Sequence, residues 1–237
     1  MGQTPRERAI RPGAFGARTS LPLWWHITVA VLLVLLVQAL GVKVYDVPSR
    51  SMEQTLEVGD RMLVNRLPAG APQRGDIVAF EASEAWQPGE SEPRSLLGGL
   101  AQVVGTITGL GPGAPYTLVK RVIGLPGETV ECCDADGRVL VDGEAIEEPY
   151  LYDDLPFRPG VLDCDTEPRS PRCFWPIVVP EGEYLVLGDH RSASADSVVA
   201  CRGGFEASDC ARFVDEELIV GRAFFVFWPL DRAGAVG

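Results

Sequence analysis

The chain has 237 residues, a formal net charge of −12, 26 glycines and 19 prolines. This length suits one substantial domain or two small ones, and the many turn-forming residues favour a mainly β protein over a helical bundle. The acidic balance speaks against nucleic-acid binding, because phosphate contacts need a basic surface. The sequence has no His-Glu-x-x-His motif and no matched Cys-x-x-Cys pairs, so we expect neither a metal nor another cofactor.

Residues 19–42 form a stretch without Asp, Glu, Lys or Arg. As a helix rising about 1.5 Å per residue, it would reach roughly 36 Å, enough to cross the hydrocarbon core of a bilayer. Four arginines precede the stretch, so the positive-inside rule predicts a cytoplasmic stub over residues 1–18 and an exported body. We therefore expect a single-pass anchor over 19–42 in the plasma membrane. A cleaved signal peptide is the alternative, but its apolar core would be shorter.

The exported body contains short runs of strand composition separated by turn residues, which predicts largely antiparallel β structure. These runs are residues 44–47, 61–65, 76–80, 117–123, 128–131, 138–141, 184–187 and 223–228. Residues 132–176 are richer in Asp, Pro and Cys, which predicts a small subdomain inserted into a core of residues 43–131 and 177–237. An apolar segment over 96–110 lies among glycines and prolines, which favours a short helix on the body or at the membrane interface over a second span.

All six cysteines lie beyond the predicted anchor, as expected for an oxidising compartment. Two pairs, Cys164 with Cys173 and Cys201 with Cys210, each enclose eight residues of loop-like composition and are predicted to form local disulfides. The neighbours Cys132 and Cys133 leave two alternatives open, a bridge between them or two free thiols.

Lysine and histidine are scarce, which limits the choice of a catalytic base. Lys43 and Lys120 are the two lysines, and His26 and His190 are the two histidines. Strand alternation places Lys120 on one face between Leu118 and Val122. Lysine, unlike arginine, can lose its proton once it is desolvated, so Lys120 is a candidate general base.

Two further segments carry polar side chains at points where a strand-like run ends. Ser51 follows such a run and Pro48, an arrangement that leaves a backbone N–H and a hydroxyl available. Residues 188–197 follow the apolar run 184–187 and hold three serines, two aspartates, a histidine and an arginine. A polar loop directly after a buried strand is a common place for site residues.

Four ordered motifs closely resemble those of bacterial type I signal peptidases, or leader peptidases. They are residues 49–60, 74–80, 120–128 and 188–197, and their order and spacing after an anchor fit the family. The single anchor, the Cys-Cys-Asp sequence and the arginine-rich composition resemble actinobacterial members. The resemblance implies a β-rich catalytic body with a serine–lysine dyad.

The resemblance also assigns roles to individual residues. Ser51 would be the nucleophile and Lys120 the general base, while the Ser51 N–H and the Ser49 hydroxyl would form the oxyanion hole. Ser194 would orient the lysine ammonium, with an Asp196–Arg121 ion pair behind it. The small pockets for substrate side chains would be lined by Tyr45, Val47, Pro48, Met52, Leu56 and Val119.

The implied substrates are exported preproteins, bound as an added strand along residues 44–47 and cut after small-x-small sequences such as Ala-x-Ala. The implied surroundings are the lipid bilayer and the neighbourhood of the secretion translocon. Two departures from the family motifs stand out: Gln54 replaces a usual proline, and Val198 replaces a usual arginine. Either Arg202 or Arg121 alone would then hold Asp196.

Three other interpretations compete with a serine–lysine peptidase. A Ser–His–Asp hydrolase would use His190 beside Asp189. A self-cleaving repressor shares the serine–lysine chemistry, but the predicted anchor and the lack of a DNA-binding segment argue against it. A membrane-tethered binding or scaffold module with a dead site is kept open by the altered end of the last motif.

Overall fold

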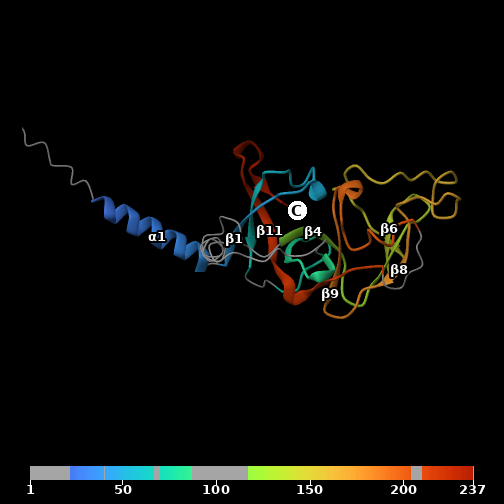
Figure 1. Ribbon diagram of the computed structural model, residues 1–237, viewed down its shortest axis with the longest axis horizontal. Coiled ribbons are helices and arrows are strands. Elements are labelled where there is room, and N and C mark those ends of the chain that lie inside the picture. Colours follow the sequence, from blue (N-terminus) through green and yellow to red (C-terminus); the bar gives the residue numbers. More distant parts are fainter. Residues whose placement is uncertain (1–21, 40, 67–69, 87–116, 204–209, 237) are drawn as a thin grey trace, which may run out of the picture. The chain divides into compact units, whose positions relative to one another are not determined.

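The computed structural model describes residues 22–39, 41–66, 70–86, 117–203 and 210–236 (Figure 1). The chain divides into two compact units, residues 1–39 and 40–237. The predicted cytoplasmic stub over 1–18 and the predicted apolar segment over 96–110 lie outside the described residues.

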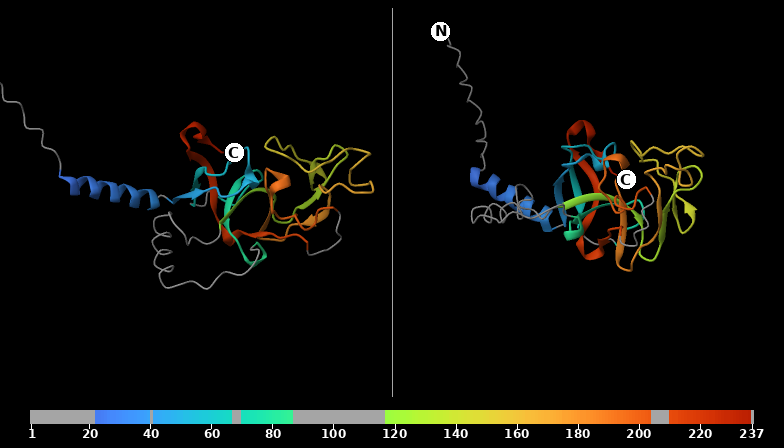
Figure 2. Two further views of the ribbon diagram at one scale, coloured as in Figure 1. Left: turned by 45° about the horizontal axis from the view of Figure 1, so that its top comes forward. Right: turned by 45° about the vertical axis from the view of Figure 1, so that its right-hand side comes forward.

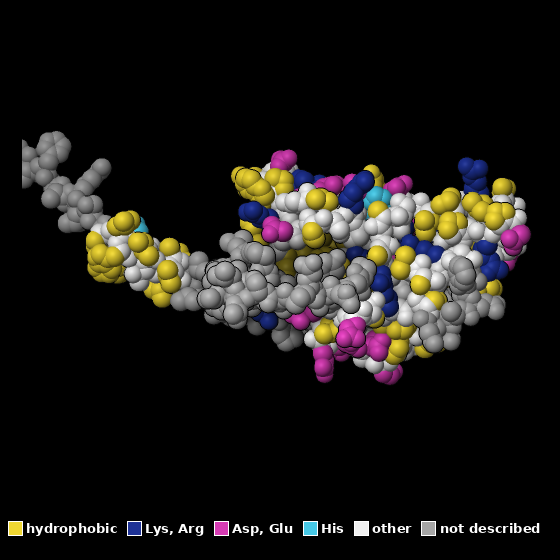
Figure 3. Space-filling model, viewed as in Figure 1, with side chains coloured by type: hydrophobic (Ala, Val, Ile, Leu, Met, Phe, Trp, Pro, Cys, Tyr) yellow, Lys and Arg dark blue, Asp and Glu magenta, His cyan; other side chains and the backbone are white. Residues whose placement is uncertain are grey.

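The first unit contains helix α1, Leu23–Ala39, whose 17 residues include no charged side chain. Leu23, Trp24 and Leu32 are exposed, and Figure 3 shows apolar side chains around the helix. The helix is shorter than the anchor predicted over 19–42. Among the described residues, no helix combines the length and the hydropathy that crossing a membrane requires.

The larger sheet of the second unit has eight strands in the order β1-β2-β11-β3-β4-β9-β10, with β12 paired to β11. Every pairing in it is antiparallel. Its strands are β1 (Val42–Asp46), β2 (Arg61–Asn65), β3 (Ile77–Glu81), β4 (Thr117–Gly124), β9 (Glu183–Leu187), β10 (Val214–Asp215), β11 (Ile219–Trp228) and β12 (Gly234–Ala235). The predicted class, mainly antiparallel β, is confirmed for this part of the chain.

A second sheet is also antiparallel and has four strands in the order β7-β6-β5-β8. They are β5 (Thr129–Cys132), β6 (Val139–Val141), β7 (Glu144–Ala145) and β8 (Phe174–Val178). Figures 1 and 2 show β6 and β8 grouped apart from β1, β4 and β11. The predicted runs do not include β8, which contains Pro176. The strand tolerates this proline at the edge of its sheet, where a missing N–H breaks no ladder.

Five one-turn 3-10 helices connect the described strands: η1 (Arg50–Met52), η2 (Glu84–Trp86), η3 (Arg191–Ala193), η4 (Glu216–Leu218) and η5 (Leu230–Arg232). Two of them hold predicted site residues: η1 carries Ser51, and η3 belongs to the polar loop 188–197.

Strand β3 shows why the body has more than one hydrophobic core. Its apolar run is continuous, and alternate side chains point to opposite faces of the sheet. Ile77 and Ala79 join a cluster with Met52 and Leu56, whereas Val78 and Phe80 join a cluster with Trp86, Val122 and Tyr184. A third cluster packs the smaller sheet and includes Ile123, Val130 and Phe174. The sheet is therefore buried on both faces where β3 and β4 cross it, and Lys120 lies in that region.

Candidate active site

Ser51 lies in a loop whose base is closed by backbone hydrogen bonds. Val47 donates to the Asp60 carbonyl and accepts from the Gly59 N–H, each at 2.9 Å. Pro48 then ends the extended run, and Ser49 precedes η1 in an extended conformation, with φ −133° and ψ 160°. Ser51 is buried in the resulting turn.

Lys120 Nζ lies 2.7 Å from Ser51 Oγ and 3.1 Å from the Val119 carbonyl oxygen. Strand β4 supplies the lysine and η1 supplies the serine, so residues far apart in the sequence meet at one point. Lys120 is 2 % exposed. The structure therefore brings together the two residues predicted to form the dyad.

The pKa of Lys120 is lowered from its ordinary range to about 8: burial is the largest cause and the charge of Arg212 adds to it, while Asp196 and Asp189 act in the opposite direction. Desolvation dominates because the ammonium form loses its hydration when it is enclosed. A substantial neutral fraction is then available near pH 8. A neutral amine at 2.7 Å from a hydroxyl can accept its proton.

The Ser49 hydroxyl lies 3.3 Å from Ser51 Oγ. The Ser51 N–H belongs to the first turn of a helix, where amides have no partner within the helix itself. The Ser51 carbonyl, in contrast, accepts a hydrogen bond from the His190 N–H at 3.1 Å. The Ser49 hydroxyl thus lies beside the serine oxygen, and the Ser51 N–H has no partner within its helical turn; these are the two groups predicted to form the oxyanion hole.

Gly188 lets the polar loop approach Ser51 closely, because any side chain there would collide with Ser194 Oγ and with the Ser51 carbonyl. Ser194 Oγ is buried and has no hydrogen-bond partner among the described residues. The structure therefore brings Ser194 near the dyad but not into the predicted hydrogen bond with Lys120. The lysine nitrogen is already bound to Ser51 and to the Val119 carbonyl.

The predicted Asp196–Arg121 ion pair is wrong. Arg121 instead binds both carboxylate oxygens of Asp189, at 2.8 and 2.7 Å. Asp196 binds Arg202, with Nη2 2.8 Å from Oδ2. The physical reason lies in β4, where successive side chains leave opposite faces, so Arg121 is directed away from the face that carries Lys120.

Two residues near the site were missed by sequence reasoning. Arg212 Nε donates to the Asp196 carbonyl at 3.1 Å. Asp189, considered before only as part of a Ser–His–Asp triad, also accepts a hydrogen bond from Thr55 Oγ1 at 2.5 Å. The Arg121 guanidinium stacks 3.8 Å from the centre of the Tyr150 ring. Asp189 thus connects the loop carrying Ser51 to β4.

The arrangement around His190 does not fit a Ser–His–Asp triad. Its Nδ1 lies 2.8 Å from Glu53, and its Nε2 lies 3.0 Å from both Asp153 and Ser192. The carboxylate of Asp189 is held by Arg121. Both ring nitrogens are therefore occupied away from the Ser51 hydroxyl.

Most residues predicted to line the substrate pockets share one hydrophobic cluster. Val47, Met52 and Leu56 are buried in it, and Tyr45 and Val119 pack against it, while Pro48 is exposed beside it. Strand β1 is at one end of the strand order, and the ladder between β4 and β9 begins only at Arg121. Of the predicted pocket residues, Tyr45 thus lies on β1 and Val119 lies in the first half of β4.

All six cysteines are in disulfides. Cys164 pairs with Cys173 at an S–S distance of 2.02 Å, Cys201 pairs with Cys210 at 2.05 Å, and Cys132 pairs with Cys133. The last pair answers the alternative that the sequence left open.

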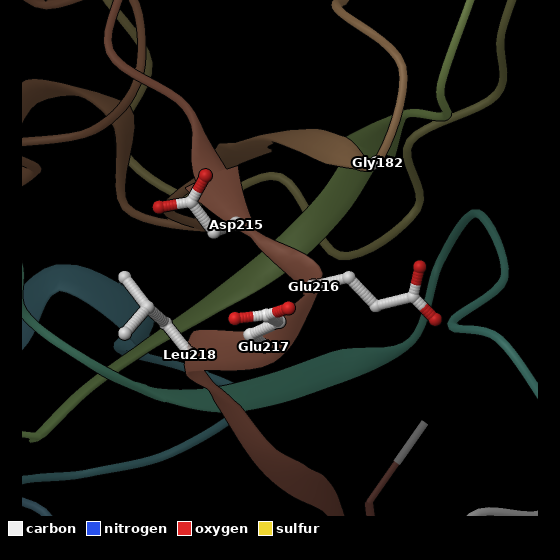
Figure 4. A pocket seen from close by; sticks show the side chains of 5 residues that line it. All are labelled: Gly182, Asp215, Glu216, Glu217 and Leu218. Carbon is white, nitrogen blue, oxygen red and sulfur yellow. The ribbon is translucent and has the colours of Figure 1, made fainter.

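A separate hollow of about 730 Å³ lies at the start of β9, the opposite end of that strand from Gly188 (Figure 4). It is lined by Gly182, Asp215, Glu216, Glu217 and Leu218. None of the predicted site residues lines it.

Comparison with known proteins shows the family of the chain. The family described as signal peptidase, peptidase S26, matches residues 21–228. The chain belongs to the signal peptidase I family. A signal peptidase I of Mycobacterium tuberculosis is 33 % identical over 219 residues, covering 88 % of this chain and 72 % of the relative. One from Leptolyngbya laminosa is 32 % identical and covers 99 % and 94 %, and one from Bacillus licheniformis is 31 % identical and covers 86 % and 87 %.

Proposed function

We propose that this chain is a serine endopeptidase that removes signal peptides from exported preproteins, with Ser51 as nucleophile and Lys120 as general base. One observation carries the proposal: a buried lysine whose nitrogen lies 2.7 Å from a serine hydroxyl. Membership of the signal peptidase I family supports the substrate class.

In the proposed mechanism, neutral Lys120 takes the proton of Ser51 as its oxygen attacks the scissile carbonyl carbon. The negative charge that develops on the carbonyl oxygen is stabilised by the Ser51 N–H and the Ser49 hydroxyl. The Lys120 ammonium returns the proton to the leaving amine, and an ester to Ser51 remains. Lys120 then takes a proton from water as the water attacks the ester, and returns that proton to Ser51 Oγ as the carboxylate product is released.

The substrate would add as a strand along the edge of β1, because an extended peptide satisfies its own backbone at an open sheet edge. Its alternate side chains would then point toward the cluster that contains Val47, Leu56 and Val119. Since those positions are already packed, shallow pockets remain and small side chains are favoured. This accounts for a small-x-small preference such as Ala-x-Ala.

We also propose a single-pass anchor over residues 19–42 in the plasma membrane, with residues 1–18 cytoplasmic and the body on the outer face, close to the secretion translocon. The absence of charge from 19–42 and the four arginines before it support this topology. Ser51 follows the anchor by nine residues, so the site would meet signal peptides as they leave the bilayer.

A tethered binding or scaffold module with a dead site is the alternative function. Its sequence-based support was the missing arginine at Val198, and the Arg202–Asp196 contact weakens that support.

The deciding experiment measures processing of a preprotein with an Ala-x-Ala site by the full-length protein. Ser51→Ala and Lys120→Arg should each reduce processing by at least about 10³-fold, because arginine cannot act as the base. Lys43→Arg is the matched control, since Lys43 is the other lysine, and His190→Ala tests the triad. Both controls should remain active, whereas processing retained in Lys120→Arg would refute the proposed mechanism.

A further inference from the structure

The carboxylate of Asp196 is the charged group that most strongly opposes deprotonation of Lys120. Asp196 is completely buried. Its Oδ2 accepts two hydrogen bonds, one from Arg202 at 2.8 Å and one from the Gly188 N–H at 3.4 Å. Its other oxygen accepts from the Val198 N–H at 3.3 Å. Arg202 is therefore the cation that neutralises this carboxylate directly.

Arg202 and Arg212 approach Asp196 from the two ends of one loop. Arg202 Nη1 also donates to the Arg191 carbonyl at 3.0 Å, which ties it to the polar loop 188–197. Arg212 donates from Nε to the Asp196 carbonyl at 3.1 Å, and its backbone N–H donates to Ser197 at 3.0 Å. The Arg212 guanidinium stacks on the Trp86 ring, 4.3 Å from the ring centre.

The disulfide between Cys201 and Cys210 joins the backbone next to both arginines. Cys201 immediately precedes Arg202, and Cys210 lies two residues before Arg212, with the two Cα atoms 5.0 Å apart. Cys201 is 1 % exposed and packs in the same cluster as Val198. The disulfide thus keeps the two ends of the loop adjacent, and Cys201 is the cysteine that is fixed in the core.

We propose that Arg202 and Arg212 are positioning residues for the Ser51–Lys120 dyad, held around Asp196 by the Cys201–Cys210 disulfide. The inference rests on the proposed peptidase function. In this chain the arginines on a disulfide-closed loop do the work of the arginine that Val198 replaces. Arg202 acts through Asp196, and Arg212 also acts on Lys120 by its own charge.

The proposal has a definite electrostatic sign. Asp196 and Asp189 favour the ammonium form of Lys120, and Arg212 opposes it. Arg202 neutralises Asp196, and Arg121 neutralises Asp189. Loss of either loop arginine leaves the negative charge less compensated, which stabilises the ammonium and raises the pKa of Lys120. The dyad would then need a higher pH to work.

The test is the pH dependence of kcat/KM for an Ala-x-Ala preprotein, measured with the full-length protein. Arg202→Gln, Arg212→Gln and the double variant Cys201→Ser/Cys210→Ser should each move the midpoint of the rising limb upward by about half a pH unit or more. Activity at pH 7 would fall by at least about threefold, whereas the high-pH plateau would stay within about twofold of wild type. A loss of packing alone would lower the plateau and leave the midpoint in place.

Two further variants make the test specific. Cys164→Ser/Cys173→Ser removes a disulfide with the same sequence separation whose cysteines lie next to neither arginine in the sequence, and its midpoint should not move. Arg202→Lys keeps the charge and should recover part of the shift seen in Arg202→Gln. Adding Arg202→Gln to the disulfide variant should shift the midpoint by less than the sum of the two changes, because both act through the same contact.

The outcomes separate this inference from the proposed function. If Ser51→Ala and Lys120→Arg are inactive but Arg202→Gln and the Cys201→Ser/Cys210→Ser variant keep the wild-type midpoint, the positioning role is refuted and the peptidase function stands. Processing retained in Lys120→Arg would remove both.

Discussion

Arg121 and Asp189 form a bidentate ion pair at 2.8 and 2.7 Å, and the two side chains are 4 % and 0 % exposed. The pair joins β4, which carries Lys120, to the end of β9, where the polar loop begins. Thr55 adds a third contact from the loop that carries Ser51. The pair thus lies where β4, the loop that carries Ser51 and the polar loop 188–197 meet.

Asp189→Asn should destabilise the fold by about 3–5 kcal/mol, because it leaves the buried Arg121 cation without its counter-charge. The free energy of unfolding in urea measures this effect. Asp46→Asn is the matched control, since Asp46 pairs with Arg61 on the surface, where both side chains are about half exposed. There the cost should stay below about 1 kcal/mol. Equal costs at the two sites would contradict the structural role of Asp189.

The activity should rise with pH through the lowered pKa of Lys120, which is about 8. Below this pKa the lysine is an ammonium and cannot accept the Ser51 proton, so kcat/KM should fall about tenfold for each pH unit. Above it the rate should level off. The measurement is a kcat/KM profile from pH 6 to 10, and a flat profile across that range would contradict a titrating base.

The same lowered pKa predicts that Lys120 costs stability. The unfolded chain holds the lysine proton up to a pH near 10.5, whereas the folded chain releases it near 8. Between these values the unfolded state binds more protons, so stability rises with pH, and the cost is fully present below about pH 8. Lys120→Met should therefore raise the free energy of unfolding at pH 7 by about 1–3 kcal/mol while abolishing activity.

A control follows from the same argument. The stability gained in Lys120→Met should shrink as the pH rises from 8 and should vanish near 10.5, where both states of the wild type are neutral at this position. Unfolding in urea at pH 7, 9 and 10.5 measures this trend. A gain that stays constant over this range would show that burial does not perturb the lysine.

Gln54 adopts a left-handed backbone conformation, with φ 78°. A proline at this position would need φ near −65°, so the family's usual residue does not fit this turn. Gln54→Gly should stabilise the fold by about 0.5–1 kcal/mol by relieving the strain of a side chain at positive φ, whereas Gln54→Pro should destabilise it by about 3 kcal/mol or more. The denaturant midpoints of the two variants measure these effects. A higher midpoint for Gln54→Pro than for Gln54→Gly would contradict this conformation.

The scarcity of lysine marked Lys120 as a candidate base, whereas Ser51 was named as its partner through the resemblance to signal peptidases. Lys120 is the single lysine of the body beyond Lys43, and its apolar neighbours on a strand signal burial. The sequence left the partner of Asp196 open between Arg202 and Arg121, and it did not predict that Arg121 binds Asp189, because that depends on which face of β4 the Arg121 side chain leaves. Cys201 and Cys210 were the available signal for Arg202, because a predicted disulfide between them would fix the position of Arg202, which composition alone does not.

Ser194 Oγ is buried, and no hydrogen-bond partner for it occurs among the described residues. An unsatisfied buried hydroxyl costs free energy, so Ser194→Ala should leave the free energy of unfolding unchanged or raise it by up to about 1 kcal/mol. Its activity should nevertheless fall by about tenfold or more, because the proton that Lys120 gains during the reaction gives the lysine another donor, and Ser194 lies beside the dyad to accept it. Unfolding in urea and kcat measured on the same preparation test the two effects together. Unchanged kcat, or a large loss of stability, would show that the hydroxyl serves the resting fold and not the charged intermediate.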